Sequence, residues 1–264
     1  MAWSKRRGPQ RIVCLTEEPT EILYALGEQD RIVGISAYTI RPPEARQTKP
    51  VVSAFIGGSV DKIVALKPDL VIGFSDIQAD LAKQLIAANL QVLIFNQRSL
   101  QEILDVVMDI GRLVDAKLGA EVLVDGFIRG LDAAAERSAA VSVRPRVYFE
   151  EWDEPMISGI QWVSELLALA GADDVFADRA GGKLARDRFV SVDEVRAADP
   201  EVLLASWCGK AFDREATELR LSGVTAVSKG QMHELPPEII LQPGPACLTD
   251  GLTALQQILE PYTR

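Results

Sequence analysis

The sequence has few basic residues and a single histidine. Its 28 lysines and arginines are outnumbered by 38 aspartates and glutamates, which gives a formal net charge of −10. A surface of that sign repels phosphate backbones, and the longest basic run is the KRR at residues 5–7. The composition therefore argues against nucleic acid as a partner.

Cysteine is also scarce, and long apolar runs are missing. Cys14, Cys208 and Cys247 are too few and too scattered for a disulfide framework. No apolar run approaches the roughly 18–20 residues of a membrane span, so we expect a soluble protein. The first residues lack the apolar stretch of a signal peptide. We therefore expect a cytoplasmic location if Met1 is the native start, and a periplasmic one if a leader precedes this sequence.

The common catalytic and nucleotide-binding motifs are missing as well. The sequence contains no GxGxxG, P-loop, HExxH, GxSxG or CxxC motif. Because His233 is the only histidine, every mechanism that needs an imidazole depends on this residue.

Strand-like and helix-like segments alternate in the first third of the chain. Apolar runs at residues 11–15, 31–37, 69–74 and 91–96 are separated by amphipathic segments such as residues 79–90. This alternation predicts a parallel sheet with helices on both faces.

The pattern changes to helix only between residues 100 and 140, and the alternation then resumes. The second helical segment, with Leu118, Val122 and Phe127 predicted on one side, is long enough to join two lobes. We predict an α/β fold of two Rossmann-like lobes with parallel sheets joined by a long helix. The N-terminal lobe covers residues 10–115, the connecting helix 116–142 and the C-terminal lobe 143–264.

One segment occurs twice, half a chain apart. SVDKIVALKPDLVIGF begins at Ser59, and SVDEVRAADPEVLLAS begins at Ser191. In each copy Ser can cap a short helix, Asp faces the positive end of the helix dipole, and Pro ends the helix before an apolar strand. The repeat predicts two similarly built halves that arose by duplication.

The chain resembles the periplasmic substrate-binding proteins that carry cobalamin, haem and ferric siderophores to ABC importers. The resemblance lies in RIVCL, TEILYALG, RIVGIS and DKIVALKPDLVIGF in the first half and SGIQWVSELLALAGADDVFAD in the second, and it is closest to the cobalamin-binding members. It implies two α/β lobes joined by a rigid helix, with the ligand held between them and little domain closure.

The resemblance also implies a docking role for one acidic residue in each repeat. In such proteins an acidic residue, usually Glu, at the start of the repeated helix docks on arginines of the membrane permease. The matching residues here are Asp61 and Asp193. The alternative is that both only stabilise the helix dipole.

Aromatic residues cluster near the predicted carboxyl ends of strands, where open α/β sheets bind ligands. Such side chains suit a flat or macrocyclic ligand. The candidates are Tyr38, Phe55, Phe74, Trp152, Trp162 and Trp207. Phe55, Phe74 and Trp162 could instead pack inward as core.

Charged residues occur in the same loops. Cobalamin carriers tend to have small neutral residues after the first strand, whereas this chain has Glu17 and Glu18 there. Further charges are Arg98, Glu150, Glu151 and Lys210. They could hold carboxylate, amide or amine groups of a ligand, or could simply be solvated.

Two hypotheses about the function follow from the sequence. The first is a non-enzymatic binding protein for a corrinoid such as cobalamin, or a related metal chelate, with no covalent cofactor, a possible permease partner and a monomeric state. The alternative is an enzyme or metal protein that uses Cys208, His233 and Glu151 in the same cleft.

Overall fold

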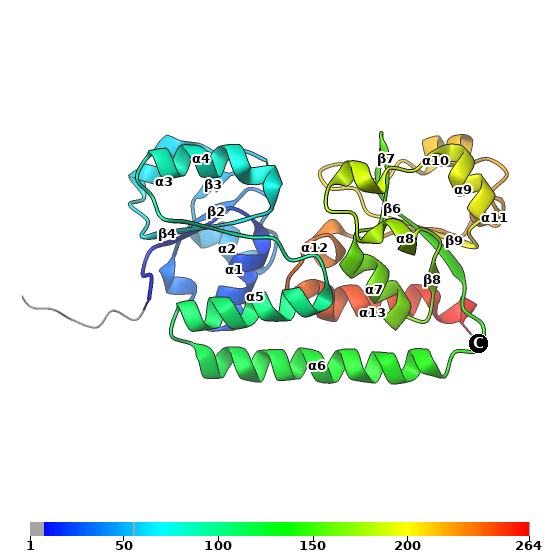
Figure 1. The fold of residues 1–264 in the computed structure, drawn as a ribbon, viewed down its shortest axis with the longest axis horizontal. Coiled ribbons are helices and arrows are strands. Elements are labelled where there is room, and N and C mark those ends of the chain that lie inside the picture. Colours follow the sequence, from blue (N-terminus) through cyan, green and yellow to red (C-terminus); the bar gives the residue numbers. More distant parts are fainter. Residues whose placement is uncertain (1–7, 55, 264) are drawn as a thin grey trace, which may run out of the picture. The chain divides into compact units, whose positions relative to one another are not determined.

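The computed structural model describes residues 8–54 and 56–263. The chain divides into two compact units (Figure 1). The first extends to Gln97 and includes Gln101–Phe127, and the second consists of Arg98–Leu100 and Ile128–Arg264. The boundary therefore falls inside the long helix that was expected to connect two lobes.

The sheet of the first unit is entirely parallel. Its strand order is β3-β2-β1-β4-β5, and the strands are β1 (Ile12–Cys14), β2 (Ile32–Ser36), β3 (Val51–Ser53), β4 (Leu70–Phe74) and β5 (Val92–Phe95). The order reverses between β1 and β4, and ligands of open α/β sheets bind outside the carboxyl ends of strands at such a reversal.

Helices cover both faces of this sheet, as Figure 1 shows. They are α1 (Glu17–Ala25), α2 (Pro43–Thr48), α3 (Val60–Ala65), α4 (Ala79–Ala87) and α5 (Leu100–Leu113), with short 3-10 turns η1 (Gln29–Arg31) and η2 (Asp76–Gln78). On the α3 and α4 side, Ile63 and Leu85 pack on Val13 and Val71 of the strands. Burial of these apolar side chains stabilises the layer.

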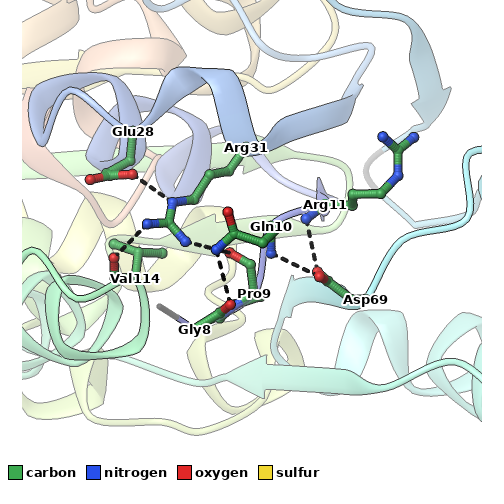
Figure 2. Close-up of polar contacts among 8 residues, drawn as sticks. All are labelled: Gly8, Pro9, Gln10, Arg11, Glu28, Arg31, Asp69 and Val114. Atoms are coloured by element: carbon green, nitrogen blue, oxygen red, sulfur yellow. Dashed lines mark hydrogen bonds and ion pairs between the residues drawn. The ribbon is translucent and has the colours of Figure 1, made fainter. Parts of the chain in front are cut away.

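Hydrogen bonds tie β1 to β4 at their amino ends (Figure 2). The backbone N–H groups of Gln10 and Arg11 each donate a 2.8 Å bond to the Asp69 carboxylate. Nearby, Arg31 donates to Glu28 and to the backbone oxygens of Pro9 and Val114. This network lies at the opposite edge of the sheet from the strand ends that could bind a ligand.

Helix α6 (Lys117–Ala139) is unbroken over 23 residues, about 35 Å at 1.5 Å per residue. Its buried side includes Ala120, Val124 and Phe127. Leu118 and Val122 are 77% and 71% exposed, so the prediction that they share the buried side of Phe127 was wrong. The prediction grouped the bulkiest apolar residues on one side. The buried residues Ala120, Val124 and Phe127 instead follow one another at spacings of four and three, close to the 3.6-residue period of a helix.

The sheet of the second unit is mixed. Its order is β10-β9-β6-β7, and β8 also pairs with β6; the strands are β6 (Arg146–Asp153), β7 (Met156–Ser158), β8 (Asp173–Asp174), β9 (Val202–Ala205) and β10 (Met232–Glu234). The strands β8, β6, β9 and β10 are parallel, as predicted for this lobe, while β7 forms an antiparallel hairpin with β6.

The helices of the second unit are mostly short. They are α7 (Gln161–Leu169), α8 (Ala177–Ala180), α9 (Val192–Ala198), α10 (Arg214–Arg220), α11 (Thr225–Ser228), α12 (Pro237–Ile240) and α13 (Leu252–Leu259), with 3-10 turns η3 (Ala185–Arg188) and η5 (Glu260–Tyr262) and a π-helical turn η4 (Cys247–Gly251). One core cluster packs Tyr148 and Leu203 of the sheet against Val195 of α9 and Leu221, which follows α10.

The two copies of the repeated segment fold in the same way. Ser59 accepts a hydrogen bond from the backbone N–H of Lys62 at the start of α3, and Ser191 accepts one from Glu194 at the start of α9. The following strands, β4 and β9, each pair with the first strand of their unit, β1 and β6. The repeat therefore occupies the same place in each sheet.

Among the described residues, no helix combines the length and the apolar character needed to cross a membrane.

Candidate functional site

The candidate site of the second unit lies at the carboxyl ends of β6 and β9, which run side by side (Figure 1). Glu150 of β6 is in register with Ala205 of β9. Trp152, still within β6, and Trp207, just beyond the end of β9, each follow two residues later. Strands β8 and β9 flank β6 on opposite sides, which makes this the topological switch point.

Lys210 lies between the two indoles. Its ammonium nitrogen is 4.4 Å from the centroid of the Trp152 ring and 4.7 Å from that of Trp207, and it donates to Asp153 Oδ1 at 2.5 Å. Two aromatic faces and a carboxylate therefore surround one cation. We call Trp152, Asp153, Trp207 and Lys210 the indole cluster. Phe212 packs edge-on against Trp207, with 5.1 Å between ring centroids.

Helix α10 contacts the end of β6 through Arg220, which pairs with Glu150. This carboxylate is fully buried, and it accepts hydrogen bonds from Arg220 Nη2 at 2.8 Å and Tyr148 Oη at 3.1 Å. Burial raises the pKa of Glu150, and the Arg220 guanidinium opposes that shift. Arg220 Nη1 also donates to the backbone oxygen of Asp153 at 3.3 Å, which fixes the end of β6.

Glu151 is held on the opposite face of β6 by Arg188. The guanidinium donates two hydrogen bonds, at 2.5 and 2.9 Å, to the two carboxylate oxygens, and the Arg188 side chain is only 4% exposed. This paired geometry is typical of a strong ion pair. Glu151 was predicted to lie in a loop, but it lies within β6, because the strand continues to Asp153 before the hairpin turn.

Glu151 and His233 do not come together. His233 lies on β10, and β9 separates β10 from β6, so the two backbones are about 10 Å apart at a strand spacing of about 4.8 Å. The His233 Nε2 atom instead lies 3.4 Å from Tyr262 Oη, and desolvation lowers the pKa of His233. Cys208 is half-buried in the loop after β9. In residues 8–54 and 56–263 no group of three His, Cys, Asp or Glu side chains could hold a metal ion.

The first unit exposes apolar side chains at its own strand ends. Tyr38 and Ile40 follow β2, Ile56 follows β3, and Ile77 follows β4; their exposed fractions are 36%, 44%, 66% and 38%. Because the strands are parallel, their carboxyl ends share one edge of the sheet. We call these four residues the first rim.

Glu17 and Glu18 lie beneath the surface of that edge. They are 1% and 2% exposed in the first turn of α1, directly after β1. Glu17 Oε1 accepts hydrogen bonds from the backbone N–H groups of Ile40 and Arg41, at 3.1 and 2.7 Å. Glu17 therefore positions the loop that carries Tyr38 and Ile40.

Burial controls the ionisation of this acidic pair. It raises the pKa of Glu17 to about 8, against the opposing effect of the two backbone hydrogen bonds. It raises the pKa of Glu18 to about 7, against a hydrogen bond from Thr16 Oγ1 at 2.9 Å. Near neutral pH the pair is therefore partly protonated.

The remaining predicted site residues are placed as follows. Phe74 and Trp162 are buried, 5% and 3% exposed, and Trp162 Nε1 donates to the backbone oxygen of Ile240. Arg98 is half-buried after β5 and groups with the second unit. Phe55 lies outside the described residues. A ligand-binding role for these residues stays a prediction.

The two predicted docking aspartates are both accessible. Asp61 is exposed at the start of α3. The Asp193 side chain is 95% exposed at the start of α9, with a weak contact of 3.8 Å to Arg196. A docking role stays a prediction for each of them.

Three residues that form ion pairs at the second-unit site were not predicted from the sequence: Asp153, Arg188 and Arg220. A signal was present in RVYFEEWD, because two acidic residues in a strand point to opposite faces, and each needs a basic partner when buried. The partners themselves lie 37 and 70 residues away in the sequence.

These features define the class of protein. The chain is an α/β ligand-binding protein with two Rossmann-like units, each carrying candidate binding residues at its strand ends. The model of the periplasmic binding protein family matches residues 12–239, and the chain belongs to this family.

Curated relatives agree with that assignment. The chain is 27% identical over 269 residues to an uncharacterised ABC transporter substrate-binding lipoprotein, YvrC, of Bacillus subtilis, covering 98% of this chain and 82% of that protein. It is 30% identical over 203 residues to the vitamin B12-binding protein of Vibrio cholerae, covering 75% and 70%.

Solved structures show the same fold. A periplasmic heme-binding protein from Pseudomonas aeruginosa matches with a TM-score of 0.84 at 22% identity, over 97% of this chain and 94% of that one. The periplasmic vitamin B12-binding protein BtuF of Vibrio cholerae matches with a TM-score of 0.75 at 25% identity, over 96% and 98%. The chain is thus a substrate-binding protein of the ABC-transporter type rather than an enzyme.

Proposed function

We propose that this protein binds a corrinoid, a cobalamin-like metal chelate, and delivers it to an ABC importer. The observation that carries the proposal is the half-buried indole of Trp152 at the switch point of the second sheet, which lies beside the indole of Trp207, 3% exposed. A rigid aromatic surface gives a large macrocycle extensive contact at low cost in side-chain entropy.

The first rim supports the same ligand class. Exposed apolar side chains that gather at one sheet edge mark a binding surface more often than scattered ones do. Tyr38, Ile40, Ile56 and Ile77 can supply apolar contacts to the hydrocarbon edge of a corrin ring.

Three ligand chemistries are named among the relatives and structural neighbours. Their names specify vitamin B12 and heme as ligands, and a further structural neighbour from Staphylococcus epidermidis is described as possibly iron-binding. We place the corrinoid first because several curated relatives that match this chain are named as vitamin B12-binding proteins.

The experiment is a titration of the purified protein with cyanocobalamin, cobinamide and haem, followed by isothermal calorimetry. Saturable binding of a corrinoid, weakened at least about tenfold by Trp152→Ala, supports the proposal, since interface aromatics are often worth 2 kcal/mol or more. Leu219→Ala, at an 81% exposed position of α10, is the matched control. Preference for haem, or indifference to all three ligands, contradicts the corrinoid assignment.

Delivery to an importer gives the two exposed aspartates a role. We propose that Asp61 and Asp193 contact basic residues of the permease, from equivalent positions in the two repeats. A protein that delivers its ligand to an importer acts on the outer side of the membrane, and we propose that location here. Fractionation of native cells, with an antibody against the protein, tests it.

A further inference from the structure

The indole cluster already holds a cation. Lys210 Nζ lies within 5 Å of two indole centroids, at 4.4 and 4.7 Å, and contacts the Asp153 carboxylate. Lysine ammonium groups are strongly hydrated, and their usual place is in solvent at the end of a flexible stem. This one lies over two aromatic faces, although its side chain remains 41% exposed.

Near its carboxyl end, β6 carries three acidic side chains that form ion pairs. Three acidic side chains of β6 each pair with one basic side chain: Glu150 with Arg220, Glu151 with Arg188, and Asp153 with Lys210. The two arginines are anchored by further bonds, Arg220 to the Asp153 backbone and Arg188 to the Ser158 backbone. Lys210 has no second anchor of that kind among the described residues, and its side chain is 41% exposed. It is the replaceable cation of the three.

When Lys210 leaves, the site keeps two indole faces, of which Trp207 is 3% exposed with Lys210 in place, and the Asp153 carboxylate, which is 22% exposed. Two electron-rich faces and one negative charge attract an organic cation, and aromatic cages of this composition recognise ammonium and methylated ammonium groups. An anion, by contrast, meets Asp153 and the faces of the rings, both of which repel it.

The dimensions suit a methylated ammonium. A cation is attracted when it lies within about 6 Å of a ring centroid. The observed distances of 4.4 and 4.7 Å are longer than an aromatic ring needs to contact a bare ammonium nitrogen through its hydrogens, and they leave room for methyl groups between nitrogen and ring.

The geometry points to a cation-binding subsite formed by Trp152, Asp153 and Trp207, which takes an organic ammonium group of a ligand and which Lys210 fills when that group is absent. The inference goes beyond the proposed function: a corrinoid has no ammonium group, so the subsite concerns a second class of ligand at the same strand end. Lys210 competes with the incoming cation, so the apparent affinity of the native protein is the intrinsic affinity multiplied by the fraction of molecules in which Lys210 has left the site.

The test uses small cations and no corrinoid. Choline and tetramethylammonium are titrated into the full-length wild type, Lys210→Ala and Lys210→Met, and tryptophan fluorescence and calorimetry follow binding. We expect both variants to bind choline at least about tenfold more tightly than the wild type, and we expect Trp152→Ala in the Lys210→Ala background to remove most of that gain. Lys183→Ala, an exposed lysine of the same unit, should leave the wild-type affinity unchanged.

The outcomes separate this inference from the corrinoid proposal. Failure of both Lys210 variants to bind either cation, with folding verified by circular dichroism, overturns the subsite whatever the result with cobalamin. Equal choline affinity in the wild type and the Lys210 variants overturns the competing role of Lys210. Tight choline binding in a protein that ignores all corrinoids retains the subsite and rejects the corrinoid.

Discussion

Arg11 and Asp69 are joined at the amino end of the first sheet by a 2.8 Å hydrogen bond from a backbone N–H to a carboxylate, and Arg146 and Glu201 are joined in the same way at 3.1 Å in the second. The arginine side chains also correspond. Arg11 donates to the backbone oxygens of Leu66 and Lys67 at the end of α3, and Arg146 donates to Ala198 at the end of α9. Each repeat is therefore fastened to the first strand of its unit by the same pair of contacts.

The first prediction concerns this fastening. Asp69→Ala removes the acceptor of two backbone N–H groups, so the free energy of unfolding should fall by about 1–3 kcal/mol, as for a lost pair of hydrogen bonds to a charged acceptor. Glu201→Ala removes one such bond and should cost less. Urea denaturation measures both. A loss in Glu201→Ala equal to or greater than that in Asp69→Ala would contradict this account.

The second prediction concerns Arg220. Its removal leaves the fully buried Glu150 without its basic partner, and breaking a buried pair from one side costs about 3–5 kcal/mol. Arg220→Met should therefore destabilise the protein strongly. Arg220→Met combined with Glu150→Met should recover much of the loss, because no buried charge then remains. Thermal unfolding of the single and double variants measures the coupling, and additive losses would show that the pair does not act as described.

The third prediction concerns pH. The pKa values of Glu17 and Glu18 are raised by burial to about 8 and about 7, so the folded state binds more protons than the unfolded state above pH about 4.5. Stability from these groups is therefore present at low pH and is lost as the pH rises towards 8. Glu17→Gln and Glu18→Gln, which stay neutral, should flatten that decline between pH 5 and pH 8. The midpoint of urea unfolding across this range is the measurement, and a wild-type slope in both variants would rule out the raised pKa values.

The fourth prediction concerns the first rim. Tyr38 is 36% exposed, so Tyr38→Ala should change the unfolding free energy by less than about 1 kcal/mol. It should nevertheless weaken ligand binding several-fold, because an aromatic contact is lost. Ile86→Ala, 62% exposed on α4, is the control and should bind normally. Equal affinity of the two variants would remove Tyr38 from the ligand surface.

The fifth prediction concerns docking. Asp61→Ala and Asp193→Ala should leave ligand affinity unchanged and lower uptake in cells that contain the cognate permease, since both side chains are exposed. The double variant should be more impaired than either single one, because two contacts are lost. Normal uptake by the double variant would contradict the docking role and leave only the interaction of each aspartate with its own helix.

Much of the fold could be read from local pattern. Ser59 and Ser191 mark helix starts because a hydroxyl satisfies a backbone N–H that the first turn leaves unpaired. Short apolar runs that follow a proline predicted β4 and β9, because a run of this length and composition is typical of a buried strand. These signals lie within a few neighbouring residues, so no tertiary information was needed.

The candidate site was predictable only in part. The positions of Trp152 and Trp207 after two strands were visible in the sequence, but the hairpin that keeps Trp152 inside β6 depends on pairing with Ile157. The burial of Glu17 depends on a loop 23 residues away, and the place of Lys210 depends on two strands meeting in register. Long-range pairings of this kind leave no local pattern.

The most direct test of the central claim is a visible absorption and mass spectrum of the protein purified from its native host. The account predicts a corrinoid band at about one ligand per chain, lost when Trp152 and Trp207 are both replaced by Ala. A colourless protein that also takes up no cobalamin or cobinamide when these are added would contradict it.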